Sequence, residues 1–434
     1  MKKIIFILLI LAIIILGIMF FFNVCPPKGP WPMPPWCSAT FSRNVFNLKV
    51  DTKPLTQVKA VNMFDTWGRN YNFKMVENTR NNIGSSFDRV KELGAEEIYV
   101  HDFHRAVFEG ESSAISMQYQ IEDEIFLNDF RDESISQEDL NKLANSAHAR
   151  GLLLGIKHNM HFMEMSKYLL SGLKGEIQKD VEKDYKEYQK PHTEEWVRDY
   201  FKKWQARMVE KGKMYELAGV DIMSVSPTFI DTSFVGNEKI ANGLWKDLIS
   251  EVRKVFTGKI HVELSMWDLV DIKNNYKNLS NFDYYKNADI VDMRFFYFPE
   301  EYRTVDVPTV QNMKVSFNKF FDDIEKFIEK NNIKLSITFS PFSYKNAINN
   351  EIFEFNDVNN KDVISKEKDW QHQADAYQAM FEDLVPKKNI ERITVGGFSW
   401  DDAMDPEVKP RISVNGSPRN KIAEEVIKQW FNAK

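Results

Sequence analysis

Several features that would point to common protein classes are missing from this sequence. It contains no P-loop, and the first strand-like run ends in Phe64-Asp65-Thr66-Trp67 where a nucleotide-binding fold would carry a Gly-rich turn. A net charge of −6 gives no reason to expect nucleic acid or an anionic membrane surface as a partner. None of the standard metal-ligand motifs is present, so we expect no metal and no cofactor.

The N-terminus, in contrast, carries a long apolar run. Residues 4–22 are uncharged and long enough to span a bilayer as a helix, and Lys2 and Lys3 precede them. Positive charge tends to stay cytoplasmic, and residues 20–24 offer no small-residue cleavage site. The pattern favours an uncleaved membrane anchor in residues 1–24 over a signal peptide or a lipoprotein modified at Cys25. We therefore predict a membrane-anchored, extracytoplasmic (cell-surface) protein that contacts the membrane through an N-terminal helix.

The two cysteines flank a Pro-rich segment between this run and the rest of the chain. Dense proline favours extended geometry, so residues 25–57 are expected to form a stiff linker and lead-in. Outside the cytoplasm a disulfide between Cys25 and Cys37 is permitted, and two free thiols are the alternative.

From residue 58 to residue 434 we expect one domain, because strand-like and helical patterns alternate throughout. Such alternation implies parallel strands joined by helical crossovers, and a count of eight strands closes a barrel. The prediction is an α/β protein, a (β/α)8 TIM barrel with long insertions at 105–133 and 159–190, after the second and third strands. An open doubly wound sheet is the alternative. The predicted strands cover residues 59–65, 97–102, 152–158, the stretch 218–231 up to its break at Pro227, 259–265, 288–296, 333–340 and 390–399.

In a TIM barrel the active site lies at the C-terminal ends of the strands, and alternation tells which side chains face the lumen. In the fifth strand His261 and Glu263 share one side, and in the sixth Asp292 and Arg294 do. Glu263 and Asp292 are therefore candidate catalytic carboxylates on adjacent strands, with Asp231 just past the fourth strand. The alternative is a structural ion-pair network, because buried charges are usually paired.

Other polar and aromatic residues end the predicted strands and are candidates for substrate contacts. Imidazoles with a carboxylate could also hold Zn²⁺, although hydrogen bonding is the commoner role of such histidines. Trp400 is a candidate floor of a sugar subsite, and a core position is its alternative. The remaining candidates are Asp65, Trp67, Asp102, His104, His158, His161, Tyr297 and Asp401.

The chain from about residue 58 onward resembles the TIM-barrel glycoside hydrolases of the endo-mannanase-like type (clan A, similar to family 113). The passages that carry the resemblance are 214–221, 244–253, 373–377 before 397–400, and 416–421 before 430–431. The resemblance implies an acid/base glutamate after the fourth strand and a nucleophilic glutamate after the seventh. Those places hold Pro227, or a neighbour, and Pro341. Proline can neither donate a proton nor attack a sugar.

These departures leave three functions open. The first is hydrolysis of a poly- or oligosaccharide at the barrel mouth by relocated carboxylates, which would make the chain a glycoside hydrolase with a glycan substrate. The second is a glycan-binding protein that has lost catalysis. The third is a metal-dependent hydrolase built on the histidines that end the second and third strands.

Overall fold

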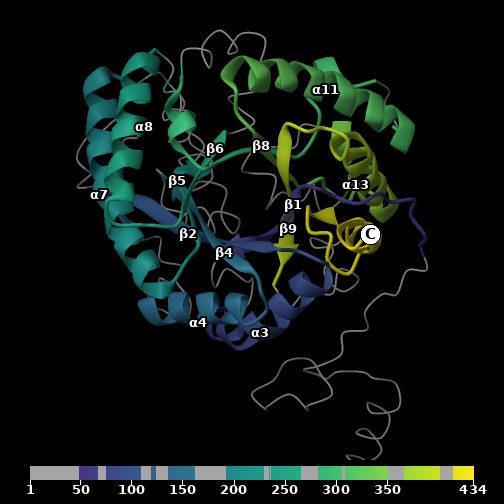
Figure 1. Ribbon diagram of the computed structural model, residues 1–434, viewed down its shortest axis with the longest axis horizontal. Helices are drawn as coiled ribbons and strands as arrows, with labels where there is room; N and C mark the ends of the chain where they lie inside the picture. Colours follow the sequence, from purple (N-terminus) through teal and green to yellow (C-terminus); the bar gives the residue numbers. More distant parts are fainter. Residues whose placement is uncertain are drawn as a thin grey trace, which may run out of the picture. The chain divides into compact units, whose positions relative to one another are not determined.

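The computed structural model describes residues 48–66, 75–108, 119–123, 135–161, 192–228, 234, 236–264, 282–304, 308–349, 366–400 and 414–434. Within this part of the chain, parallel strands form a closed ring and helices surround it (Figure 1). The ring order is β1-β9-β8-β7-β6-β5-β4-β2, and β1 closes it by pairing with β2. The predicted (β/α)8 TIM barrel is confirmed, and the open sheet is excluded.

All eight predicted strands are present. The barrel strands are β1 (Val58–Thr66), β2 (Glu97–Phe108), β4 (Leu153–His161), β5 (Ile222–Thr228), β6 (Lys259–Leu264), β7 (Ile290–Phe295), β8 (Leu335–Phe339) and β9 (Ile390–Ser399). β2 is six residues longer than predicted because its end pairs antiparallel with β3 (Tyr119–Asp123). Part of the first predicted insertion is therefore a hairpin arm of the sheet.

Helices connect or follow most of the barrel strands. They are α3 (Met75–Glu92), α4 (Gln137–His148), α7 (Glu194–Ala218), α8 (Glu238–Arg253), α11 (Val310–Asn331), α13 (Trp370–Leu384) and α15 (Ile422–Phe431). Ser136 and Thr193 cap α4 and α7. The spacing of Ser85 and Asp88 is typical of a capping box and predicts a helix start at Ser85. Ser85 nevertheless lies inside α3, because the helix begins ten residues earlier.

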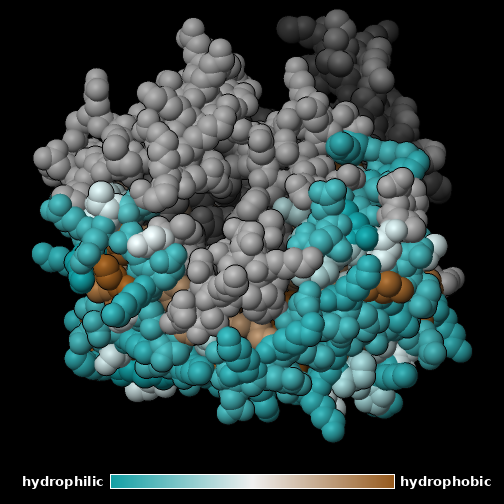
Figure 2. Space-filling view, turned by 90° about the horizontal axis from the view of Figure 1, so that it is seen from above, coloured by the Kyte–Doolittle hydropathy of each residue, from teal (hydrophilic) through white to brown (hydrophobic). Residues whose placement is uncertain are grey.

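Apolar side chains fill the layer between the strands and the helices. Trp204 of α7, Trp245 of α8 and Trp430 of α15 are among the largest fully buried side chains. Most of the aromatic content therefore belongs to the core. On the face that Figure 2 shows, the described residues are mainly hydrophilic, with small, separate hydrophobic areas.

Two carboxylates, one half-buried and one exposed, fix the strand register at the N-terminal end of the barrel. Asp221, just before β5, accepts a hydrogen bond from Leu154 N of β4 at 2.8 Å. Asp289, just before β7, accepts one from Ile260 N of β6 at 2.7 Å. Each carboxylate joins the start of one strand to its neighbour, so this face of the barrel is built for stability.

The predicted localisation needs correction. In the described part of the chain, no helix has the length and apolar character that crossing a membrane requires. The apolar run 4–22, Cys25 and Cys37 lie outside the described residues. The prediction of a membrane-anchored, extracytoplasmic protein therefore does not stand.

Candidate functional site

The lumen of the barrel is polar except for one layer near its N-terminal end. There Ala60, Tyr99, Ile222 and Ile290 pack together. Next to them Arg392 of β9 donates two hydrogen bonds to Glu97 of β2, at 2.8 and 3.0 Å. The Tyr99 hydroxyl also donates to Glu97, at 2.9 Å. The Glu97–Arg392 ion pair joins β2 and β9, the two strands that flank β1.

Above that layer, one buried ammonium group holds two carboxylates. Lys157 Nζ of β4 lies 3.0 Å from Glu263 Oε2 and 2.7 Å from Asp292 Oδ2. Arg294 donates a second cationic hydrogen bond to Glu263 Oε2 at 2.9 Å. Thr338 Oγ1 donates to Asp292 Oδ2 at 2.7 Å, and His261 Nε2 lies 3.5 Å from it. The inward direction predicted for the polar side chains of these strands is confirmed, and they form an ion-pair network.

The charges of this network fix the ionisation of its carboxyl groups. Burial alone would raise the pKa of Glu263, but Arg294 and Lys157 outweigh it and lower that pKa. Lys157 and a hydrogen bond from His261 likewise hold the pKa of Asp292 well below its usual range, against the effect of burial. A glycosidase acid needs the opposite shift, because it must carry a proton at neutral pH. Both groups are anions bound to cations.

The next layer toward the mouth contains a second hydrogen-bonded chain. His101 Nε2 of β2 lies 2.7 Å from Asn62 Oδ1, and Asn159 Nδ2 of β4 lies 3.1 Å from His101 Nδ1. Burial, Arg294 and Lys157 lower the pKa of His101 well below its ordinary value, so the ring is neutral. Because Asn159 donates to Nδ1, the ring proton sits on Nε2 and is donated to Asn62.

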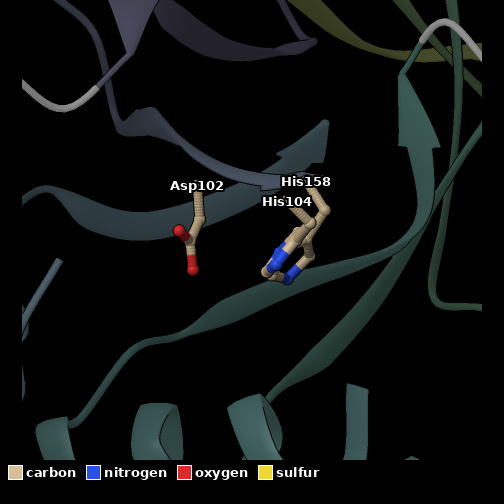
Figure 3. Close-up of side chains that lie close together, drawn as sticks. All are labelled: Asp102, His104 and His158. Atoms are coloured by element: carbon tan, nitrogen blue, oxygen red, sulfur yellow. The ribbon is translucent and has the colours of Figure 1, made fainter. Parts of the chain in front are cut away.

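Asp102, His104 and His158 were predicted to face the mouth, and the structure places them elsewhere. All three lie on the outer side of β2 and β4, because their lumen-facing neighbours are His101 and Lys157 (Figure 3). The imidazole of His104 contacts Trp204 of α7, with ring centres 5.3 Å apart. These side chains therefore join the barrel wall to α7 and do not line the lumen.

The same three residues are close enough to form a candidate metal site, since their ligand atoms lie within 4.8 Å of one another. The donor atoms, however, already have other contacts. Lys211 Nζ lies 2.9 Å from Asp102 Oδ2, and the Tyr215 hydroxyl donates to that same oxygen at 2.7 Å. His104 Nε2 and His158 Nδ1 lie 2.8 Å apart. A lysine ammonium beside the carboxylate disfavours a second cation, so we interpret the cluster as a structural link.

The other predicted site residues divide into core positions and undescribed ones. Trp400 is buried and stacks on Phe87 of α3 with ring centres 5.9 Å apart, so it is not an open platform for a sugar. Tyr297 also lies in the apolar core. Trp67, Asp231 and Asp401 lie outside the described residues, as do the side chains of Asp65 and His161. Their roles remain predictions.

A cleft of about 640 Å³ opens at the opposite, N-terminal end of the barrel. Four of its charged or titratable residues form two pairs: His148 Nε2 lies 2.8 Å from Asp221 Oδ2, and Arg253 donates to Asp289 at 2.8 Å. Active sites of this fold lie at the other end of the strands. We therefore assign this cleft no role in binding.

Lys157 is the residue that the sequence analysis missed. It stands between Ile156 and His158 in an apolar strand, on the same side as Gly155 and Asn159. Applying the two-residue alternation to this strand, as to the fifth and sixth predicted strands, would have placed its amine in the lumen. Which carboxylates it meets depends on strand order around the ring.

Comparison with known proteins finds similarity in structure only. No family model matches the chain, and no curated protein matches it by sequence. A GH113 beta-1,4-mannanase structure superposes with a TM-score of 0.56 at 14% identity, covering 88% of this chain and 100% of that one. The GH113 beta-mannanase from Alicyclobacillus acidocaldarius gives 0.53 at 13% identity, covering 88% and 98%. The chain thus has a GH113-like TIM-barrel fold, and the resemblance seen in the sequence is confirmed at the level of fold.

Proposed function

We propose that this barrel binds a poly- or oligosaccharide at its C-terminal mouth and that Glu263 and Asp292 do not hydrolyse it. The observation that carries the proposal is the Lys157 ammonium, which lies within hydrogen-bond distance of both carboxylates. A sugar cleaved between them would need the space that this ammonium fills.

The spacing of Glu263 and Asp292 alone is not sufficient for a hydrolytic role. Retaining glycosidases hold their carboxyl groups roughly 5 Å apart, and two oxygens bridged by one ammonium are in a comparable range. What differs is protonation: one group must be a proton donor, and here both pKa values are lowered. With Pro227 in β5 and Pro341 two residues beyond β8, neither strand end supplies a replacement acid at these positions.

Support for glycan binding comes from the fold and from the lumen. The two superposed structures are those of beta-mannanases, and the upper lumen of this chain is lined by neutral hydrogen-bonding groups, among them Asn62, His101 and Asn159. Sugars are recognised through many hydroxyl contacts, which such groups provide. The use of the fold here is an analogy, and the lumen chemistry is independent of it.

The test is a glycan panel assayed for both binding and cleavage with the full chain. We expect binding by calorimetry and no new reducing ends. Cleavage by the wild-type chain would implicate either Glu263, which the variants below test, or carboxylates outside the described residues, of which Asp231 and Asp401 are the predicted ones.

The assignment of Glu263 has its own matched control. Glu263→Gln and Glu97→Gln each neutralise a buried glutamate that is bound to an arginine, one near the mouth and one at the far end. We expect both to lower stability by about 3 kcal/mol, because each leaves a buried cation uncompensated. If the wild type cleaves a glycan and only Glu263→Gln abolishes that cleavage, Glu263 is catalytic and the proposal fails.

A further inference from the structure

Several buried polar atoms in the lumen have no hydrogen-bond partner within the described part of the chain, among them Asp292 Oδ1, His261 Nδ1 and Ser336 Oγ. Two more belong to side chains that lie nearer the mouth. One is Arg294 Nε, a donor on β7, and the other is Asn159 Oδ1, an acceptor on β4. Both side chains are more than nine-tenths buried. A buried polar group without a partner costs about 1 to 3 kcal/mol, so such groups usually mark a place that something else fills.

Each of these atoms ends one of the two hydrogen-bonded chains described above. Arg294 donates to Glu263 through a terminal guanidinium nitrogen, and its Nε–H has no acceptor among the described residues. Asn159 donates to His101 through its amide nitrogen, and its amide oxygen has no donor among the described residues. β4 and β7 are three positions apart around the ring, so the two side chains enter the lumen from different sides. A ligand at the mouth that reached both side chains would meet one donor and one acceptor.

The charge of the surroundings is already balanced. The cations Lys157 and Arg294 face the anions Glu263 and Asp292, and the hydrogen bonds of His101 are those of a neutral ring. Arg294 is 7% exposed and Lys157 is 1% exposed, so the arginine lies nearer to solvent than the lysine. An added ligand charge would be buried here without a partner, and that is costly. A hydroxyl group, in contrast, both donates and accepts.

We propose, on the basis of the function above, that Arg294 Nε and Asn159 Oδ1 bind hydroxyl groups of an uncharged sugar and make the mouth selective for neutral glycans. Glycans built of uronic acids or of amino sugars are then excluded from this position. Glu263 acts as a positioning residue, because it fixes the guanidinium of Arg294.

The experiment compares three classes of probe on the full chain by calorimetry: neutral hexose oligosaccharides, oligogalacturonides and chitosan oligosaccharides. We expect binding of neutral oligomers and at least about tenfold weaker binding of both charged classes. Tighter or equal binding of a charged class would overturn the inference and leave glycan binding intact. Binding of none of the probes would instead remove the proposed function itself.

A matched pair of variants tests the residue assignment. Arg294→Lys keeps the positive charge beside Glu263 and removes Nε–H, and Arg392→Lys makes the same exchange beside Glu97 at the far end. We expect Arg294→Lys to weaken binding of neutral oligomers about tenfold and Arg392→Lys to leave it unchanged. Equal binding by wild type and Arg294→Lys would exclude Arg294. Asn159→Ala is the second variant, and we expect it to weaken binding of neutral oligomers about tenfold as well. Equal binding by wild type and Asn159→Ala would exclude Asn159.

Discussion

At the residue scale, one side chain decides how two others can be used. Lys157 converts Glu263 and Asp292 from candidate acids into fixed anions, because its ammonium stabilises their charged forms. Without it the same carboxylates would share a buried site, where repulsion would raise at least one pKa.

Replacing Lys157 by methionine is expected to cost about 3 to 5 kcal/mol of folding free energy. The variant leaves two buried carboxylates, only one of which keeps a cationic partner, Arg294. Lys142→Met is the control, because Lys142 pairs with Glu138 on the exposed face of α4. It should cost well under 1 kcal/mol. Urea unfolding measures both, and equal losses would contradict the importance of the network.

Asp383 on α13 gives a prediction about pH. Burial raises the pKa of Asp383 to about 6, against the opposing charge of Lys387, and Asp322 and Glu325 add to the rise. The folded state therefore binds this proton more tightly than the unfolded chain does. Ionisation of Asp383 therefore destabilises the folded protein. The loss of stability begins as the pH rises above the unfolded pKa of about 4, is complete above the folded pKa, and persists at higher pH.

The substitution Asp383→Asn removes that penalty. We expect the variant to be about 2 kcal/mol more stable than wild type at pH 7.5 and nearly equal to it at pH 4. Thermal or urea unfolding at the two pH values measures the difference. A stabilisation of the same size at both values would show that ionisation of Asp383 is not its cause.

At the scale of elements, local caps define the helices where a capping residue is present. Ser136 accepts from Asp139 N at 3.1 Å while the Asp139 carboxylate accepts from Ser136 N at 3.1 Å. Ser85 and Asp88 have the same spacing but lie inside α3. The pattern alone does not distinguish a helix start from a helix interior, because the distinction depends on the residues before it.

Two serine substitutions test this difference. Ser136→Ala should destabilise the protein by about 1 kcal/mol, because it leaves a first-turn amide without its acceptor. Ser85→Ala should change stability by less than about 0.5 kcal/mol, since alanine is favourable within a helix. Chemical denaturation of both variants provides the comparison. A larger loss for Ser85→Ala would mean that its side chain carries an essential contact.

At the scale of the whole molecule, closure of the ring joins distant parts of the chain. β1 pairs with β2 and with β9, and the Glu97–Arg392 pair crosses this seam between residues 295 positions apart. The pair is buried, so removing one partner leaves a charge that nothing compensates.

A double-mutant cycle measures the contribution of that seam. Glu97→Gln and Arg392→Met should each cost about 3 kcal/mol, and the double variant should cost less than their sum. The double variant loses less unfolding free energy than this sum because the second substitution removes the charge that the first left unpaired. Strict additivity in urea unfolding would mean that the two groups act independently.

The sequence predicted the fold well and the site only in part. Strand β9 was predicted with its observed bounds, because a Gly-containing run of β-branched residues between charged neighbours is a local pattern. The inward direction of Glu263 and Asp292 also followed from local alternation. Asp102, His104 and His158 were placed on the wrong side of the wall, because their strand ends were read without applying the same alternation.

The sequence by itself determined the kind and order of the elements, since periodicity, caps and helix-ending glycines act over a few residues. Only the tertiary structure decided the state of the carboxylates. Lys157 is 106 residues from Glu263 and 135 from Asp292, and the closed ring brings the three together. Whether a carboxylate is an acid or a paired anion depends on charges a few ångströms away, and local sequence does not contain them.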